Sequence, residues 1–395
     1  MIAERAKQIS FSTTMQINQK ASELKSRGID VIDLSVLEPD FPTSIHIKNS
    51  GIHAIENNFT KYTPATGIPE LKQAIRNRIS ADYKISYEQD EIIVSNGAKH
   101  SLFNAFMALV NQGEEVIVPL PIWVSYPEQI KLAQGIPVFI HTDEKDNFLL
   151  SGEKLKKAIT KKTRAIILCN PCNPTGTVYP EDVLRELSEI CMNADIHIIV
   201  DEIYDKFIFD NIQFVSIAQL SEEIKKSAII INGVSKTYSM TGWRIGYAAG
   251  PSEIISAMGK IQSHSTSNPC SISQKAAIEA LSGNQAGVLI MRDEFQTRRD
   301  LVYNQLQNIQ DIITIKPQGA LNIFPNISGY LKSKNRNMKF ENSYDFSKYI
   351  LENAHVAVVP GSAFGNDRHI RISFSKSMND LKMGMERINK SLTAL

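Results

Sequence analysis

The sequence predicts an α/β protein with a mostly parallel sheet flanked by helices, followed by a smaller α+β domain. Short apolar runs alternate with longer amphipathic stretches through the middle of the chain, and this alternation stops after about residue 287. The composition, 43% hydrophobic and 22% charged over 395 residues, is that of a folded globular protein. Strands that alternate with helices are joined by crossover connections, so we expect a parallel sheet covered on both faces.

Apolar runs between about residues 90 and 250 predict the strands of this sheet. They are 91–97, 115–119, 137–140, 164–170, 195–202 and 227–233. The amphipathic stretches between them predict helices at 98–111, 124–134, 151–160 and 180–193. Pro180 and the acidic residues after it are typical of a helix start. In such sheets, ligands bind at the carboxyl ends of the strands.

The last part of the chain predicts the α+β domain. It contains a long charged helix near 291–307, short strands near 312–315, 320–324, 356–359 and 369–373, and a closing helix from about 378. The stretch before residue 45 also lacks the alternation of strands and helices, so we expect it to pack with this later part. The predicted division is 1–45 as an N-terminal arm and part of the small domain, 46–286 as the large domain and 287–395 as the small domain.

Charge and cysteine content narrow the functional classes. Lys and Arg total 43 against 42 Asp and Glu, so no field of one sign favours a nucleic acid or an anionic membrane. No segment approaches about 20 apolar residues, and the N-terminus lacks the apolar core of a signal peptide. The 4 cysteines are too few for a disulfide framework, and Cys169-x-x-Cys172 has no second pair to complete a metal site. We expect a cytoplasmic protein without a metal.

Candidate site residues follow the ends of predicted strands. The run 195–200 leads directly into Asp201, with Tyr204 three residues later; taken alone, such an aspartate is more typical of a helix N-cap. Lys236 follows the run 227–231 and lies between two apolar segments, with Arg244 close behind. A loop lysine is most often a surface charge. Desolvation and a neighbouring cation, however, lower a lysine pKa, and an unprotonated amine can attack a carbonyl to form a Schiff base.

Two further turns complete the candidate site. At 95–100 a strand gives way to a helix, and free N–H groups there make a phosphate seat, although neither a P-loop nor GxGxxG is present. The double turn 170–176 holds the amide of Asn173 in a rigid frame. A Schiff-base lysine, an acid able to pair with a ring nitrogen and a phosphate seat are together what pyridoxal phosphate requires.

Several longer motifs occur in order across nearly the whole chain. They are KYTPATGIPELK, IWVSYPEQ, NPCNPTG, VDEIY, VSKTYSMTGWRIGYAAG, VAVVPGSAFG and HIRISFS. Together they resemble the class I pyridoxal-phosphate-dependent aminotransferases of fold type I, most of all the bacterial aspartate aminotransferases. The resemblance implies a pyridoxal-phosphate-dependent transferase-like large domain and a homodimer. It also implies an exchange of the amino group between L-aspartate and 2-oxoglutarate, which gives oxaloacetate and L-glutamate.

The resemblance also implies roles for individual residues. Lys236 would hold the cofactor as a Schiff base and move the proton at the substrate α-carbon, and Asp201 would keep the pyridine nitrogen protonated. The other implied cofactor contacts are Asn173 and Tyr204 at the phenolic oxygen, Trp123 on the ring face, Gly97, Ala98, Lys99 and Arg244 at the phosphate, and Tyr62 from the neighbouring subunit. The implied substrate contacts are Arg371 at the α-carboxylate and Lys99 at the distal carboxylate, together with Asn173, Trp123 and Leu37. For Lys99, an exposed lysine in a first helical turn is the alternative.

Some positions depart from the family pattern. Leu37 stands where the family usually has a glycine whose N–H faces the substrate carboxylate, and Leu321-Asn322 replaces an aromatic pair. Gly233 stands where some relatives have a phosphate-binding serine. An aminotransferase for prephenate or for aromatic or neutral amino acids is therefore the alternative. A pyridoxal-phosphate-binding regulator is a weaker one, because it would need an added basic helix-turn-helix for which the N-terminus leaves no room.

Overall fold

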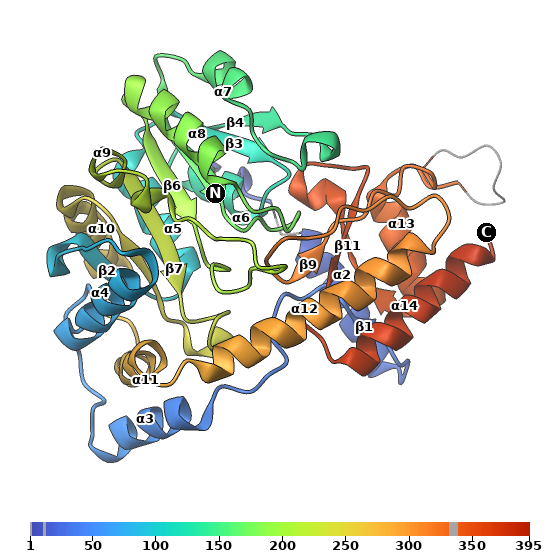
Figure 1. The fold of residues 1–395 in the computed structure, drawn as a ribbon, viewed down its shortest axis with the longest axis horizontal. Coiled ribbons are helices and arrows are strands. Elements are labelled where there is room, and N and C mark those ends of the chain that lie inside the picture. The colour runs from blue at the N-terminus through green and yellow to red at the C-terminus, as the bar shows by residue number, and fades with distance from the viewer. Residues whose placement is uncertain (1, 11–12, 332–338) are drawn as a thin grey trace.

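The computed structural model describes residues 2–10, 13–331 and 339–395, and a seven-stranded sheet forms its centre (Figure 1). The strands lie in the order β2-β8-β7-β6-β5-β3-β4. Their bounds are β2 Ile92–Ser95, β3 Glu115–Leu120, β4 Ile136–His141, β5 Thr163–Cys169, β6 His197–Asp201, β7 Ala228–Gly233 and β8 Gly246–Ala249. The strands β3 to β7 pair in parallel, which confirms the predicted mostly parallel sheet.

The strand β8 is the antiparallel member of this sheet. It pairs in the antiparallel sense with both β2 and β7. The segment 234–245 between β7 and β8 contains only the short 3₁₀ turn Thr241–Trp243. Without a crossover helix, the chain turns back beside the strand that it has just left, so the two strands run in opposite directions. The sequence marked the residues after Arg244 as apolar but did not predict the direction of the strand that they form.

Helices cover both faces of the sheet. On one face lie α5 (Ala98–Leu109), α6 (Ser125–Leu132) and α10 (Ser252–Ser265). On the other lie α4 (Pro69–Tyr83), α7 (Gly152–Ala158), α8 (Glu181–Asn193), α9 (Glu222–Lys225) and α11 (Ser271–Ser282). Neighbouring strand residues such as Ile198 and Ile199 are buried in different clusters because successive side chains point to opposite faces. The helices predicted at 98–111, 124–134, 151–160 and 180–193 are confirmed to within a few residues.

The last part of the chain carries a separate small sheet in the order β11-β12-β9. Its strands are β9 Asn322–Ile323, β11 Val359–Pro360 and β12 Ile370–Ser373. The helices around it are α12 (Ala286–Gln307), α13 (Ser343–Tyr349) and α14 (Met378–Thr393), and α12 extends from beside α11 to α14 (Figure 1).

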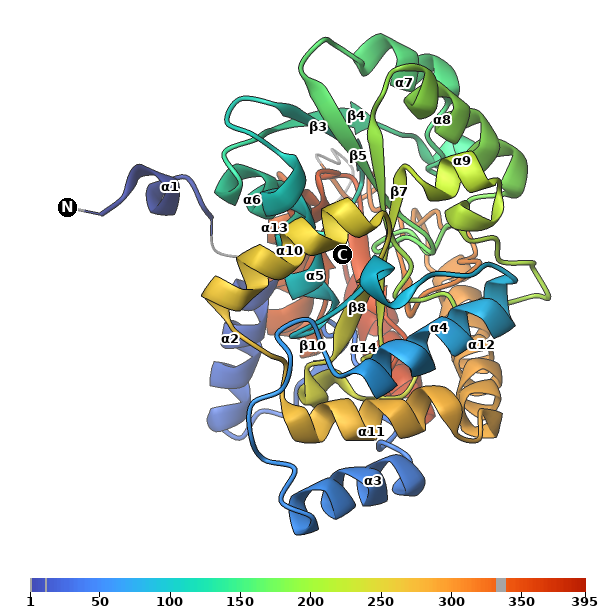
Figure 2. The same cartoon turned by 90° about the vertical axis from the view of Figure 1, so that its left-hand side faces the viewer.

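The start of the chain packs against this part. The strand β1 (Ile32–Asp33) pairs in parallel with β10 (Val356–Ala357). The helices α2 (Thr13–Ser26) and α3 (Ile45–Glu56) lie on either side of β1 in sequence, and Figure 2 shows α1 (Glu4–Lys7) standing away from the rest of the chain. The domain boundaries at 45 and 286 stay a prediction.

The strand predicted at 312–315 is wrong. The segment forms a single antiparallel bridge, between Ile313 and Asn326. The backbone of Pro325, next to this bridge, faces the other way and accepts from the N–H of Ile370, and the side chain of Ile313 is 66% exposed. A longer ladder would therefore lack a buried face around Ile313 to stabilise it.

In the described residues, no helix is long and apolar enough to cross a membrane. No group of three or more His, Cys, Asp or Glu side chains in the same ranges could hold a metal ion.

Candidate active site

A cavity of about 440 Å³ lies at the carboxyl ends of β5, β6 and β7. Most of the predicted site residues line it: Leu37, Ala98, Lys99, Trp123, Asn173, Asp201, Tyr204, Lys236, Arg244 and Arg371. The carboxyl ends of parallel strands meet at one edge of a sheet, so residues from distant motifs gather there. The predicted residues Gly97 and Tyr62 are not among the lining residues.

Asp201 is the last residue of β6 and its side chain is buried. Tyr126 donates its hydroxyl hydrogen to Oδ2 at 2.6 Å, and the N–H of Ile203 donates to Oδ1 at 3.1 Å. Burial raises the pKa of Asp201 to about 6, while these two hydrogen bonds and the charge of Lys236 act in the opposite direction. The described segment that follows forms turns, so the N-cap alternative for Asp201 is wrong.

Lys236 reaches the cavity from the loop between β7 and β8. Its Nζ donates a hydrogen bond to the carbonyl of Leu37 and lies 6.0 Å from the ring centroid of Tyr204. Burial, together with the charges of Arg371 and Arg244, lowers the pKa of Lys236 to about 8, against the opposing charges of Glu38 and Asp201. A fraction of the amine is therefore unprotonated near neutral pH, which is the form that attacks a carbonyl.

The N-terminus of α5 forms a cradle for an anion. Gly97 has φ +85° there, and a Cβ on it would collide with Nη2 of Arg244, so glycine lets the guanidinium lie against the helix start. The Nη1 of Arg244 donates to the Thr241 carbonyl at 2.8 Å, and this hydrogen bond holds the guanidinium in place. Within the described residues, no hydrogen bond uses the amides of Ala98 or Lys99. Two free amides and a guanidinium fit a phosphate group.

Arg371 lies on β12 and is 4% exposed. Its Nη1 donates to Oδ1 of Asn173 at 3.2 Å, its Nη2 donates to the Ser35 carbonyl, and its guanidinium lies 4.9 Å from the ring centroid of Phe364. Burial lowers its pKa to about 10. Its Nε has no hydrogen-bond partner, and no carboxylate of the described ranges forms an ion pair with it. A buried guanidinium that has no carboxylate partner of its own is suited to bind a carboxylate ligand.

Lys99 and Trp123 form the outer side of the cavity. The Nζ of Lys99 lies 4.8 Å from the ring centroid of Trp123, and Trp123 meets Tyr126 edge to face at 5.3 Å. Burial and the charge of Arg244 lower the pKa of Lys99. Lys99 also lines a neighbouring cavity of about 520 Å³, so this residue borders both spaces.

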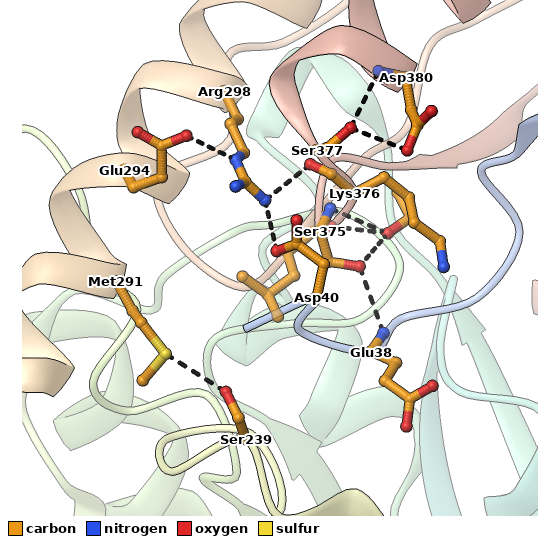
Figure 3. Close-up of polar contacts among 12 residues, drawn as sticks. Glu38, Asp40, Ser239, Met291, Glu294, Arg298, Ser375, Lys376, Ser377 and Asp380 are labelled. Atoms are coloured by element: carbon orange, nitrogen blue, oxygen red, sulfur yellow. Dashed lines mark hydrogen bonds and ion pairs between the residues drawn. The ribbon is translucent and has the colours of Figure 1, made fainter. Parts of the chain in front are cut away.

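The segment Ser35–Asp40, which we call the strap, closes one side of the cavity. Its residues Ser35, Val36 and Leu37 line the space. Figure 3 shows how Ser375 holds the strap: the N–H of Glu38 donates to Ser375 Oγ at 3.2 Å, and the N–H of Asp40 donates to the Ser375 carbonyl at 3.2 Å.

The remaining sequence candidates lie elsewhere. Tyr62 is 91% exposed, outside the cavity of its own chain. Leu321 and Asn322 are fully buried, and the Asn322 amide donates to the Pro174 carbonyl behind the site. A side chain at Gly233 would crowd Gly246 on the neighbouring strand, so this position has no room for the serine hydroxyl that some relatives have there.

Ser35, Tyr126 and Thr241 are among the lining residues that the sequence did not single out. Tyr126 lies in the IWVSYPEQ motif, which was noted for Trp123 alone. A tyrosine one helical turn after a cavity-lining tryptophan was the available signal, but its partner was not evident from the sequence.

Known proteins that are similar in sequence are aminotransferases. The family model for aminotransferase class I and II matches residues 29–388. An aspartate aminotransferase of Bacillus sp. (strain YM-2) is 46% identical over 390 residues, covering 99% of this chain and 98% of that protein. A probable aspartate/prephenate aminotransferase of Rickettsia conorii is 44% identical over 397 residues, covering 100% of this chain and 99% of that protein.

Solved structures give the same result. The aspartate aminotransferase of Rhizobium meliloti superposes with a TM-score of 0.96 at 42% identity, covering 100% of this chain and 99% of that one. The aspartate aminotransferase of Thermus thermophilus with maleate superposes with a TM-score of 0.93 at 35% identity, covering 99% of both chains.

Proposed function

Because the chain belongs to the class I and II aminotransferase family, whose members use pyridoxal phosphate, we propose that it exchanges the amino group between L-aspartate and 2-oxoglutarate. The observation that carries this proposal is a pair of cations at one cavity. Arg371 is buried without a carboxylate partner among the described residues, and Lys99 stands at the rim. Two cations at one cavity suit a substrate with two carboxylates.

The residues of the cavity fit the cofactor. Bound pyridoxal phosphate supplies an aldehyde that takes up the amino group and a ring that accepts the electrons released at the substrate α-carbon. We assign its phosphate to the cradle of Gly97, Ala98, Lys99 and Arg244, and its ring nitrogen to the carboxylate of Asp201. Because Asp201 is buried and hydrogen-bonded by Tyr126, its charge meets the ring without competing water. Asn173 and Tyr204 are assigned to the phenolic oxygen and Trp123 to the ring face.

The substrate is held by the opposite wall. Arg371 binds the α-carboxylate with its planar fork, and Asn173, already 3.2 Å from that fork, keeps its orientation. Lys99 binds the distal carboxylate. The strap residue Leu37 also lines the cavity.

Lys236 moves the proton at the substrate α-carbon. The role requires an amine that is a base near neutral pH, and burial lowers its pKa to about 8. The position at the end of β7, opposite the ring of Tyr204, holds Nζ inside the cavity rather than in solvent.

A substrate panel tests the proposal. Aspartate, glutamate and phenylalanine are offered in turn to the aldehyde form of the holoenzyme, the oxo acid prephenate is offered to its amine form, and the change in cofactor absorbance is followed. We expect aspartate and glutamate to react, and Lys99→Ala to lower kcat/KM for aspartate by about tenfold or more, since a hydrogen-bonded charge is lost. The reaction of any aromatic substrate should not change. Absence of aspartate turnover by the unaltered enzyme would contradict the substrate assignment.

Prephenate is the second candidate substrate. The Rickettsia conorii relative, 44% identical over the full length, carries the name probable aspartate/prephenate aminotransferase. Prephenate also has two carboxylates, so the same pair of cations suits it. Turnover of prephenate in the panel supports this second activity, and its absence restricts the enzyme to aspartate and glutamate.

We further propose a cytoplasmic homodimer in which Tyr62 reaches the partner's site. Three observations support the dimer. Tyr62 is 91% exposed, Ile52 and Ile55 of the nearby helix α3 are 51% and 53% exposed, and α1 buries none of its residues (Figure 2). The cytoplasmic location is supported by cysteines that are all free thiols.

Mixing inactive subunits tests the shared site. Tyr62→Ala and Lys236→Ala proteins are each expected to be impaired. A mixed dimer contains one site with both Lys236 and the other subunit's Tyr62, so activity should return on mixing and subunit exchange. If the mixture is no more active than the separate proteins, Tyr62 does not act at the site of the other subunit.

A further inference from the structure

The strap and the strand that carries Arg371 are joined along their length. The N–H of Ser373 donates to the Leu34 carbonyl at 2.8 Å, just before the strap, and the N–H of Asp40 donates to the Ser375 carbonyl at 3.2 Å, at its end. Arg371 itself donates from Nη2 to the Ser35 carbonyl. A shift of the strap therefore moves an acceptor that orients the Arg371 guanidinium.

One arginine outside the cavity holds the far end of this assembly. Arg298 of α12 is 6% exposed, and its Nη1 donates to Oδ1 of Asp40 at 2.7 Å and to the Lys376 carbonyl at 2.7 Å (Figure 3). Its Nε donates to Oε1 of Glu294 at 2.8 Å. The guanidinium also lies 5.1 Å from the ring centroid of Phe41. The strap, the chain after β12 and α12 thus meet at one side chain.

We propose that Arg298, through its ion pair with Asp40, is a positioning residue that sets the strap against Arg371 and thereby controls affinity for the substrate carboxylate. The inference rests on the proposed function, since it concerns the same site. Arg298 does not line the cavity, so its effect reaches the ligand only through the strap and β12.

The planar shape of the guanidinium explains why an arginine serves here. Its donors point to Asp40, Lys376 and Glu294 at the same time, in a fixed fork. A lysine ammonium on a flexible stem cannot hold three acceptors from three segments in one plane. Arg298→Lys therefore keeps the charge and loses the geometry, while Asp40→Asn keeps the shape and loses the charge.

The neighbouring residue provides a matched control. Arg299 is also in α12, is fully buried, and donates to both carboxylate oxygens of Asp210 at 2.7 Å and to the Pro317 carbonyl at 2.8 Å. It makes the same kind of ion pair without touching the strap. Arg299→Lys and Asp210→Asn are therefore expected to change stability as the test variants do, but not ligand affinity.

The experiment compares the four holoenzyme variants with the unaltered enzyme. The dissociation constant of maleate, a dicarboxylate with no amino or oxo group to exchange, is measured by spectral titration. KM and kcat for aspartate and the melting temperature are measured in parallel. We expect Arg298→Lys and Asp40→Asn to weaken maleate binding and raise KM by about tenfold, the factor for one charge-assisted hydrogen bond, with kcat and cofactor content nearly unchanged. The Arg299 and Asp210 variants should keep the maleate affinity.

Two results would overturn the proposal. One is an equal loss of maleate affinity in the Arg298 and Arg299 variants, and the other is a lower melting temperature of Arg298→Lys with unchanged maleate affinity. If Arg298→Lys does not fold, the comparison of Asp40→Asn with Asp210→Asn decides. Failure of the proposed function would appear separately, as a lack of aspartate turnover by the unaltered enzyme, whatever the variants do to maleate binding.

Discussion

Tyr126 donates a hydrogen bond of 2.6 Å from its hydroxyl to Oδ2 of Asp201, across 75 positions of the sequence. Both side chains are buried, and burial alone would favour the uncharged acid. The hydroxyl opposes this effect because it stabilises the ionised form. The helix α6 thus contributes to the charge at the end of β6, which we assign to the cofactor ring.

Tyr126→Phe should raise the pKa of Asp201 above its value of about 6, because the hydrogen bond to the charged form is lost. Asp201 is then ionised only at higher pH, so the acid limb of the pH profile of kcat/KM should move upward. Tyr87→Phe is the control, since Tyr87 is equally buried and its hydroxyl has no partner among the described residues. An unchanged acid limb in Tyr126→Phe would contradict the assignment of that limb to Asp201.

Lys236→Ala should lower transamination by about 10²–10⁴-fold or more, since the residue that transfers the proton is removed. Reduction with borohydride and peptide mapping checks the covalent role: the cofactor should be fixed to the peptide containing Lys236. Lys72→Ala is the control, because burial also lowers the pKa of Lys72 but its Nζ bonds to the Gln89 carbonyl outside the site. A label on any other peptide would refute the assignment.

Glu38→Gln should lower the pKa of Lys236 below about 8, because the charge of Glu38 acts to raise it. The unprotonated amine exists above the pKa, so a lower pKa extends its reactivity to lower pH. The rate of cofactor uptake by the cofactor-free protein, followed by absorbance, should therefore rise at a lower pH than in the unaltered protein. Glu153→Gln is the control, because Glu153 pairs with Lys157 and is not among the charges that act on Lys236, so its profile should not move.

His369 should make the protein less stable in acid. It is buried, its Nε2 lies 3.0 Å from Oε2 of Glu144, and burial lowers its pKa to about 4. The unfolded chain binds this proton at a pKa of about 6.5, so the stabilising contribution is complete above that pH and is lost as the pH falls towards 4.

The measurement is the melting temperature of the unaltered protein and of His369→Gln between about pH 7 and pH 4, the range set by these pKa values. Glutamine retains a donor for Glu144 and does not titrate. The unaltered protein should lose more stability across this range than the variant. Parallel curves would contradict a neutral His369 in the folded protein.

The strand ends of the large sheet were accessible from the sequence. Each apolar run predicts its own strand, and polar residues such as Asp201, Asn173 and Lys236 follow directly after such runs. Because parallel strands end at the same edge, the order of local elements was enough to bring these side chains to one cavity. The direction of β8 was not accessible in this way, since antiparallel pairing depended on the absence of a crossover helix between it and β7.

Contacts between separate elements were decided by the tertiary structure alone. The sequence by itself determined the alternating strands and helices, and with them the residues that gather at the carboxyl edge of the sheet. The pairing of Tyr126 with Asp201, the docking of the strap on β12 and the ion pair of Arg298 with Asp40 arise only when elements pack. The physical reason is range: hydrophobic periodicity acts within a few turns or strand residues, whereas a side-chain hydrogen bond depends on where two distant backbones come to lie.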